Sequence, residues 1–137
     1  MTLPQRYVLD KVMKFKIIKD EFLEVLGTTL GIVEKKNIMP ILANVLLEAD
    51  EPILKISATD LDVAINVKVQ AQVDEPGKIT VSAKNLYDIV KESAGKETLI
   101  QTSEDDRLEI TSNQSRYKIM GLSAKEFPKI PVEDGKF

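Results

Sequence analysis

Two segments in the first half of this chain each resemble a segment in the second half. This internal similarity constrains the possible fold more than any other feature. The segment KFKIIKDEFLEVL (14–26) aligns without gaps with KITVSAKNLYDIV (78–90), and LLEADEPILKISATDLDVAI (46–65) aligns with IQTSEDDRLEITSNQSRYKI (100–119). The two alignments occur in the same order along the chain. Their offsets of 64 and 54 residues differ by ten, which one longer connection in the first half would absorb. The pattern indicates a duplicated unit.

Each copy of the unit has the pattern of a short alternating strand, a helix with apolar residues at helical spacing, and three further strands. In the first copy we expect strands near 14–18, 42–49, 53–58 and 62–72, with a helix over about 20–33. In the second copy we expect strands near 78–82, 98–103, 107–112 and 115–121, with a helix over about 84–94 that Ser82 caps and Gly95 ends. Two βαβββ units, at about 14–72 and 78–122, therefore predict an α+β domain in which two helices pack against antiparallel sheets.

The residue types that the chain lacks remove most catalytic chemistry. It has no cysteine and no histidine, which excludes thiol and imidazole groups as nucleophiles, bases or metal ligands from this sequence. Neither of the glycine-rich phosphate-binding patterns, G-x-G-x-x-G or G-x-x-x-x-G-K-[ST], occurs in it. We therefore expect a protein that is not an enzyme and that uses no cofactor.

Location and charge give weaker indications. No apolar run approaches the roughly 18 residues that a membrane span requires, and no secretory signal pattern opens the chain. Because cysteine is absent as well, we expect a cytoplasmic protein with no membrane partner. The net charge of −3 does not by itself point to nucleic acid.

The segment ISATDLDVAI (56–65) holds the one pattern that suggests an enzyme, because Asp60 and Asp62 have the spacing of a metal-binding carboxylate pair. The same two residues fall between two predicted strands, where Thr59 and Asp60 can hydrogen-bond nearby backbone N–H groups. We favour the turn. A metal-dependent enzyme that uses Asp60 and Asp62 stays as the less favoured alternative.

Several motifs together carry a resemblance to a known family. The run MPILANVLLEA, then LKISATDLDVAI, EPGKITVSAKNLYDIVK and SRYKIMGLSAKEFPKIP resemble, in this order, the first (N-terminal) domain of the bacterial DNA polymerase III β subunit, the family of sliding clamps. The resemblance begins at Met13 and runs to about Pro131, so we assign 13–137 to a sliding-clamp N-terminal domain. Residues 1–12 fall outside it and are expected to be an upstream extension or sequence added for expression.

This resemblance implies a non-catalytic processivity factor. Members of the family have three similar domains per chain, and two chains form a ring around duplex DNA that tethers DNA polymerase III. The implied partners are duplex DNA without sequence preference, a second clamp chain, DNA polymerase III and the clamp loader. The pocket that holds polymerase and clamp loader lies in the later domains of the family. The face that complements the ring interface lies on the third domain, so we expect the chain alone to be mainly monomeric. A free-standing domain that pairs through an edge strand is the alternative.

The resemblance also implies residues that contact DNA. One basic position of the family falls on Lys36, with Lys35 adjacent, and another falls on Lys84 at the start of the second helix. Lys91 lies two turns further along that helix, so it could share the same exposed side. Lysine keeps the positive charge that attracts phosphate but lacks the bidentate geometry of arginine.

The last predicted hairpin corresponds to the ring interface of the family. Arg107 and Arg116 fall on basic interface positions, and Tyr117 and Ile119 fall on apolar ones. Gln114 and Asn85 replace basic residues that are common at their positions, which would weaken the electrostatic part of the contact. An ordinary exposed edge strand guarded by charges is the competing interpretation.

Overall fold

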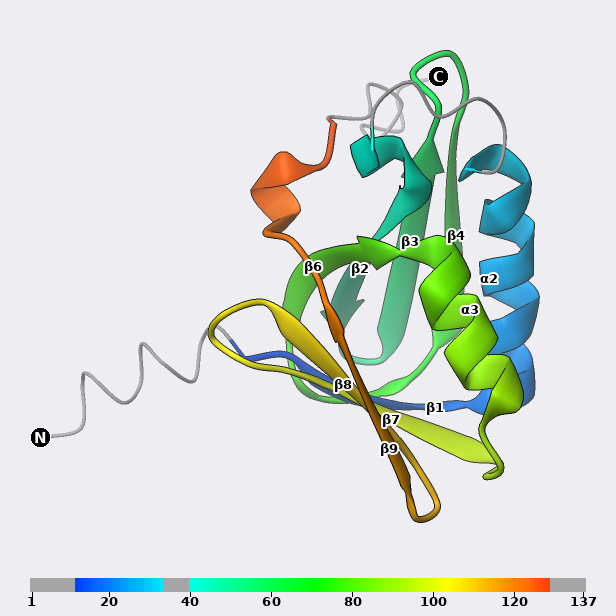
Figure 1. Ribbon diagram of the computed structural model, residues 1–137, viewed down its shortest axis with the longest axis vertical. Coiled ribbons are helices and arrows are strands. Elements are labelled where there is room, and N and C mark those ends of the chain that lie inside the picture. Colours follow the sequence, from blue (N-terminus) through cyan, green and yellow to red (C-terminus); the bar gives the residue numbers. More distant parts are fainter. Residues whose placement is uncertain (1–11, 34–39, 129–137) are drawn as a thin grey trace, which may run out of the picture.

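The computed structural model describes residues 12–33 and 40–128, and it shows two antiparallel sheets with two helices beside them (Figure 1). The helices are α2 (Lys19–Val33) and α3 (Ala83–Glu92), and short 3-10 turns are η1 (Pro40–Ala43) and η2 (Ala124–Glu126). The strands in chain order are β1 (Lys14–Ile18), β2 (Asn44–Asp50), β3 (Ile53–Thr59), β4 (Ala64–Gln70), β5 (Gln72–Glu75), β6 (Gly77–Ser82), β7 (Glu97–Thr102), β8 (Arg107–Ser112) and β9 (Ser115–Met120). The predicted α+β class with two βαβββ units is confirmed.

The two units are joined by an exchange of their first strands. One sheet has the order β5-β1-β7-β8-β9, so the first strand of the first unit pairs with β7 and joins the sheet formed by the last three strands of the second. The other sheet has the order β4-β3-β2-β6, so the first strand of the second unit pairs with β2 and joins the sheet formed by β2, β3 and β4 of the first. Each sheet therefore contains parts of both units, and neither unit could form its sheet alone.

The core lies where the inner faces of the sheets meet the helices. Period-two alternation places every second strand residue inside, as in β1, where Phe15 and Ile17 are buried, Lys14 and Lys16 are half-buried and Ile18 is exposed. The ring of Phe15 meets the ring of Phe22 on α2 edge to face, with centroids 6.3 Å apart. Leu108 and Ile110 of β8 are fully buried in the same cluster. This burial fixes which side of the five-stranded sheet faces outward.

The two helices lie side by side on one side of the molecule (Figure 1). On α2 the buried residues are Phe22, Leu26, Thr29 and Val33, and on α3 they are Ala83, Leu86 and Val90. Helix α2 packs mainly on β3 and β4. The opposite side of each helix is left exposed. Among the described residues, no helix is long and apolar enough to cross a membrane.

Two details of the predicted elements are wrong. The single strand expected over 62–72 is two strands, β4 and β5, which belong to different sheets because the chain changes sheet at Ala71, whose N–H donates to the carbonyl of Pro52 (3.0 Å). Helix α3 ends at Glu92 with Ser93 as its cap, before Gly95. Gly95 is buried, and a Cβ there would lie 2.7 Å from Ser112 Oγ, so its small size serves packing and does not end the helix.

Candidate nucleic-acid and subunit interfaces

The segment between β3 and β4 is a hydrogen-bonded turn. Asp60 Oδ1 accepts the backbone N–H groups of Asp62 (3.0 Å) and Val63 (2.8 Å), and Thr59 Oγ1 accepts the N–H of Leu61 (3.0 Å). Leu61 adopts a left-handed backbone conformation with φ 82°, which reverses the chain here. Within 12–33 and 40–128, no cluster of three or more acidic side chains could hold a metal ion. The turn interpretation of Asp60 and Asp62 is confirmed.

Helix α3 presents two of the lysines predicted to contact DNA. Its first turn is held by Ser82, whose Oγ accepts the N–H of Asn85 (3.1 Å), as predicted. Lys84 is exposed, and its Nζ lies 3.2 Å from Asp88 Oδ2 one turn later. Lys91 is exposed in the last turn, seven residues from Lys84 and therefore on the same side of the helix. An exposed pair at this spacing contributes only about 0.3–0.5 kcal/mol, so Asp88 does not prevent Lys84 from turning to a phosphate.

The exposed surface of the two helices is acidic over the described residues. The two helices carry five exposed carboxylates and two exposed lysines, a difference of −3 (two minus five), and half-buried Lys19, whose Nζ donates to the carbonyl of Ser93, adds one positive charge and makes the total −2. The carboxylates are those of Asp20, Glu21, Glu24, Asp88 and Glu92, and the lysines are Lys84 and Lys91. The predicted positions Lys35 and Lys36 lie outside the described residues. The lysines on the helix surface can therefore contact phosphate groups individually, but they do not form a continuous basic patch.

The hairpin of β8 and β9 brings the two predicted interface arginines to the surface. Arg107 is exposed, and its Nε lies 3.3 Å from Asp105 Oδ2; Arg116 is exposed, and its Nε lies 3.3 Å from Glu109 Oε2. Strand β9 is the edge of its sheet, so in the described structure it pairs only with β8. Both guanidinium groups are therefore within reach of a chain that paired with this edge.

Tyr117 and Ile119 lie on the opposite face of β9 from Arg116. The register pairs them with Ile110 and Leu108, which are fully buried, and both pack partly buried against the core. Their remaining surface is what a neighbouring chain could cover. These two residues therefore contribute to the fold of the domain as well as to any contact at its edge.

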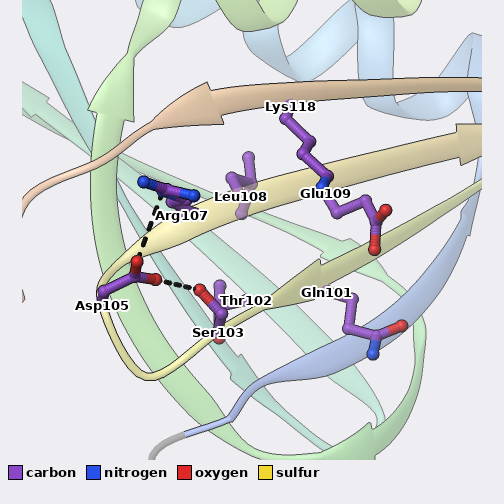
Figure 2. Close-up of a pocket in the computed structure, with 8 residues that line it drawn as sticks. All are labelled: Gln101, Thr102, Ser103, Asp105, Arg107, Leu108, Glu109 and Lys118. Carbon is purple, nitrogen blue, oxygen red and sulfur yellow. Dashed lines mark hydrogen bonds and ion pairs between the residues drawn. The ribbon is translucent and has the colours of Figure 1, made fainter.

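A shallow hollow of about 290 Å³ lies beside this hairpin, on the outer face of the sheet (Figure 2). At its end, Asp105 accepts a hydrogen bond from the hydroxyl of Ser103 and lies beside Arg107. The Ser103 hydrogen bond, helped by the Arg107 charge, lowers the pKa of Asp105 below its usual value of 3.8. Gln101, Glu109 and Lys118 line the rest of the hollow. Sequence reasoning did not single out Asp105, although its position two residues before Arg107 in a predicted turn was visible.

Comparison with known proteins covers nearly all of the described residues. Residues 13–131 match the profile of the family described as DNA polymerase III beta subunit, N-terminal domain. A beta sliding clamp from Caulobacter vibrioides is 42% identical over 118 residues, which are 85% of this chain and 32% of that protein. A beta sliding clamp from Pseudomonas putida is 37% identical over 125 residues, which are 90% of this chain and 33% of that protein.

The crystal structures of similar proteins agree with the fold. The beta sliding clamp of C. crescentus superposes with a TM-score of 0.84 at 38% identity, covering 90% of this chain and 33% of that one. The DNA polymerase sliding clamp of Bacillus subtilis superposes with a TM-score of 0.83 at 25% identity, covering 87% of this chain and 33% of that one. The chain spans about one third of the length of the curated relatives that it matches.

Proposed function

Because the chain belongs to the DNA polymerase III β-subunit family, through its N-terminal domain, we propose that it supplies the first domain of a ring that encircles duplex DNA. In this role the domain catalyses nothing. The ring tethers DNA polymerase III to its template, and the proposed setting is the bacterial cytoplasm. The observation that carries the proposal is the match over residues 13–131, with the same fold in solved sliding clamps.

The arrangement of the elements supports a DNA-facing side and an outward side. The exposed sides of α2 and α3 adjoin one another, and Lys84 and Lys91 project from α3. We propose that these two lysines, together with Lys35 and Lys36, contact phosphate in the ring. Phosphate contacts carry no base information, so such a surface allows sliding. Because exposed carboxylates outnumber lysines on the described helix surface, encirclement and not local affinity would keep the ring on DNA.

The β9 edge is the proposed site of ring closure. A strand of a second chain could extend the five-stranded sheet through its free backbone groups. Arg107 and Arg116 would then face acidic groups of that chain, and the exposed parts of Tyr117 and Ile119 would be covered. The clamp loader and DNA polymerase III are further proposed partners of the full-length protein.

The test is the length of the DNA that polymerase makes before it dissociates. The full-length protein that carries this domain, loaded by the clamp loader on primed circular DNA, is expected to lengthen the products of DNA polymerase III under single-encounter conditions. A variant with Lys84→Glu and Lys91→Glu should shorten them, while Lys125→Glu, an exposed lysine away from the helices, should not. Products of unchanged length with and without the protein would contradict the proposal.

A further inference from the structure

Helices α2 and α3 run in opposite directions on the side of the molecule that we propose to face DNA (Figure 1). Lys19, at the start of α2, donates from Nζ to the carbonyl of Ser93, the cap at the end of α3 (2.6 Å). The start of α3 therefore lies beside the second half of α2. That half, residues 27–33, carries no charged side chain. The carboxylates of α2 all lie in its first half, at Asp20, Glu21 and Glu24.

Tyr87 lies on α3 between Lys84 and Lys91 and reaches toward α2. It follows Lys84 by three residues and precedes Lys91 by four, so the three side chains share one side of the helix. A Cβ at Gly27 on α2 would lie 3.8 Å from Tyr87 Cε1. Because Cε1 is bonded to the carbon that carries the hydroxyl, the hydroxyl end of the ring lies over Gly27. Gly27 is exposed, so this end of the ring lies at the surface where the two helices meet.

The hydroxyl of Tyr87 is available to a ligand. Tyr87 is half-buried, and its ring packs against the core. The hydroxyl is not itself fully buried, and it makes no hydrogen bond with another residue of the described part of the chain. The packed ring holds the hydroxyl in place, because a tyrosine side chain has only two χ angles to order. Tyr87 therefore presents a fixed hydrogen-bond donor beside two lysines.

The charges around Tyr87 explain why a neutral donor suits this surface. The described helix surface has a total charge of −2, so its lysines do not make it basic. On α3 the next residue, Asp88, pairs with Lys84 (3.2 Å), and on α2 Glu24 lies one turn before Gly27. Both carboxylates reduce the attraction that the lysines exert on phosphate. A hydroxyl can donate a hydrogen bond to a phosphate oxygen without a net positive charge.

We propose that the Tyr87 hydroxyl donates a hydrogen bond to a backbone phosphate of the duplex inside the ring, between the contacts of Lys84 and Lys91. The inference rests on the proposed function, because it adds a contact to the same surface. Tyrosine is one of the side chains that bind phosphate oxygens in complexes with DNA, and such a contact carries no base information. Lysine contacts weaken as salt rises, whereas a neutral donor releases no counterion and keeps its contribution.

The test compares variants of the full-length protein on a short, fluorescently labelled duplex of mixed sequence. Anisotropy gives the dissociation constant between about 50 and 200 mM salt, where lysine contacts with phosphate lose much of their affinity. Tyr87→Phe removes the hydroxyl and keeps the ring, and Lys84→Gln removes one positive charge. The control Thr111→Val removes a half-buried hydroxyl from β8, on the side of that strand opposite the buried Ile110. Denaturant unfolding checks that each variant keeps its fold.

We expect Tyr87→Phe to weaken binding about fivefold at every salt concentration, which corresponds to about 1 kcal/mol, the net value of a typical hydrogen bond. The slope of log K against log salt should not change, because the group that is removed has no charge. Lys84→Gln should reduce this slope by about 0.9, the value for one phosphate that is no longer neutralised. Thr111→Val should change neither quantity. The loss with Tyr87→Phe should be equal on AT-rich and GC-rich duplexes.

Different results would contradict the Tyr87 contact and the DNA contact of the helices. If Tyr87→Phe leaves the affinity unchanged while Lys84→Gln reduces the slope, the helices contact DNA but the hydroxyl does not. If Tyr87→Phe reduces the slope, or if Thr111→Val weakens binding equally, the effect is not the loss of one neutral donor. A loss that depends on the duplex sequence would assign the hydroxyl to a base. If neither Lys84→Gln nor Tyr87→Phe changes binding, the proposed DNA contact of the helices is wrong as well.

Discussion

Replacing Ile119 with alanine removes apolar surface from the edge strand β9. The structure allows the lost free energy to be divided between the stability of the domain and the contact with a second chain. Full burial of an isoleucine side chain is worth roughly 1.5–3 kcal/mol. Ile119 is half-buried against Leu108 in the core, so about half of this value, near 1 kcal/mol, stabilises the domain itself. If a second chain covers the remainder, Ile119→Ala weakens each ring contact by a similar amount, which is about fivefold per contact. A ring of two chains has two such contacts, so the dissociation constant of the dimer should rise by roughly thirtyfold.

The assay is the dissociation of the full-length dimer, followed by analytical ultracentrifugation on dilution, with denaturant unfolding as the measure of stability. Ile65→Ala is the matched control, because Ile65 is the internal counterpart of Ile119 in the aligned repeat and is also half-buried, on β4, an edge strand of the other sheet. It should destabilise the domain without changing ring closure. Arg107→Ala, which breaks only an exposed pair, should weaken closure less than Ile119→Ala.

Two results would refute this reasoning. If Ile119→Ala costs the 2–5 kcal/mol that is typical of a fully buried isoleucine or leucine and leaves dissociation unchanged, Ile119 belongs to the core alone. If Ile65→Ala and Ile119→Ala weaken closure equally, the effect is a general loss of stability and β9 is not the interface.

Four further predictions concern the 137-residue chain by itself. It should bind duplex DNA weakly and with strong salt dependence, because encirclement is not available to it; sub-micromolar binding at physiological salt would contradict this. It should be mainly monomeric in dilute solution, since the face proposed to complement β9 belongs to a later domain; a ring-sized oligomer in light scattering would rule this out. Ser103→Ala should raise the pKa of Asp105 more than Arg107→Gln does in an NMR titration, because the Ser103 hydrogen bond is the larger cause of its low value; the reverse order would show that the cause is misassigned. Because the folded pKa lies below 3.8, the stabilising contribution of Asp105 is present above that pH and is lost as the pH falls through the folded value. Asp105→Asn should remove this part of the acid dependence, and an unchanged acid limb of the stability curve would argue against it.

The repeat in the sequence predicted the elements well because strand alternation and helical spacing are local properties. It did not predict that β1 and β6 exchange sheets, since the choice of strand partners depends on packing between residues that are distant along the chain. Nor did it predict the change of sheet at Ala71, where one apolar pattern continues through two strands. The packing role of Gly95 depends on Ser112, on a different strand, and could not be read from its neighbours.

The candidate site residues also include some features that the sequence predicted and others that it could not. The exposure of Lys84 and Arg116 followed from their positions on a helix and an edge strand. The inward direction of Tyr117 and Ile119 could also have been predicted, because they alternate with Arg116 and Lys118 as core residues do. The cross-strand neighbours of Lys14 and Lys118 could not, because they depend on a register that only the folded chain defines.

We propose that this domain is part of a ring that topology holds on DNA, and release on cutting the DNA tests this proposal most directly. The full-length protein, loaded by the clamp loader on nicked circular DNA and freed of unbound protein by gel filtration, should stay with the circle at physiological salt. A single restriction cut should release it, because the ring can then slide off the ends, and blocking both ends with bound protein should prevent the release. Equal retention on circular and linear DNA would contradict the account.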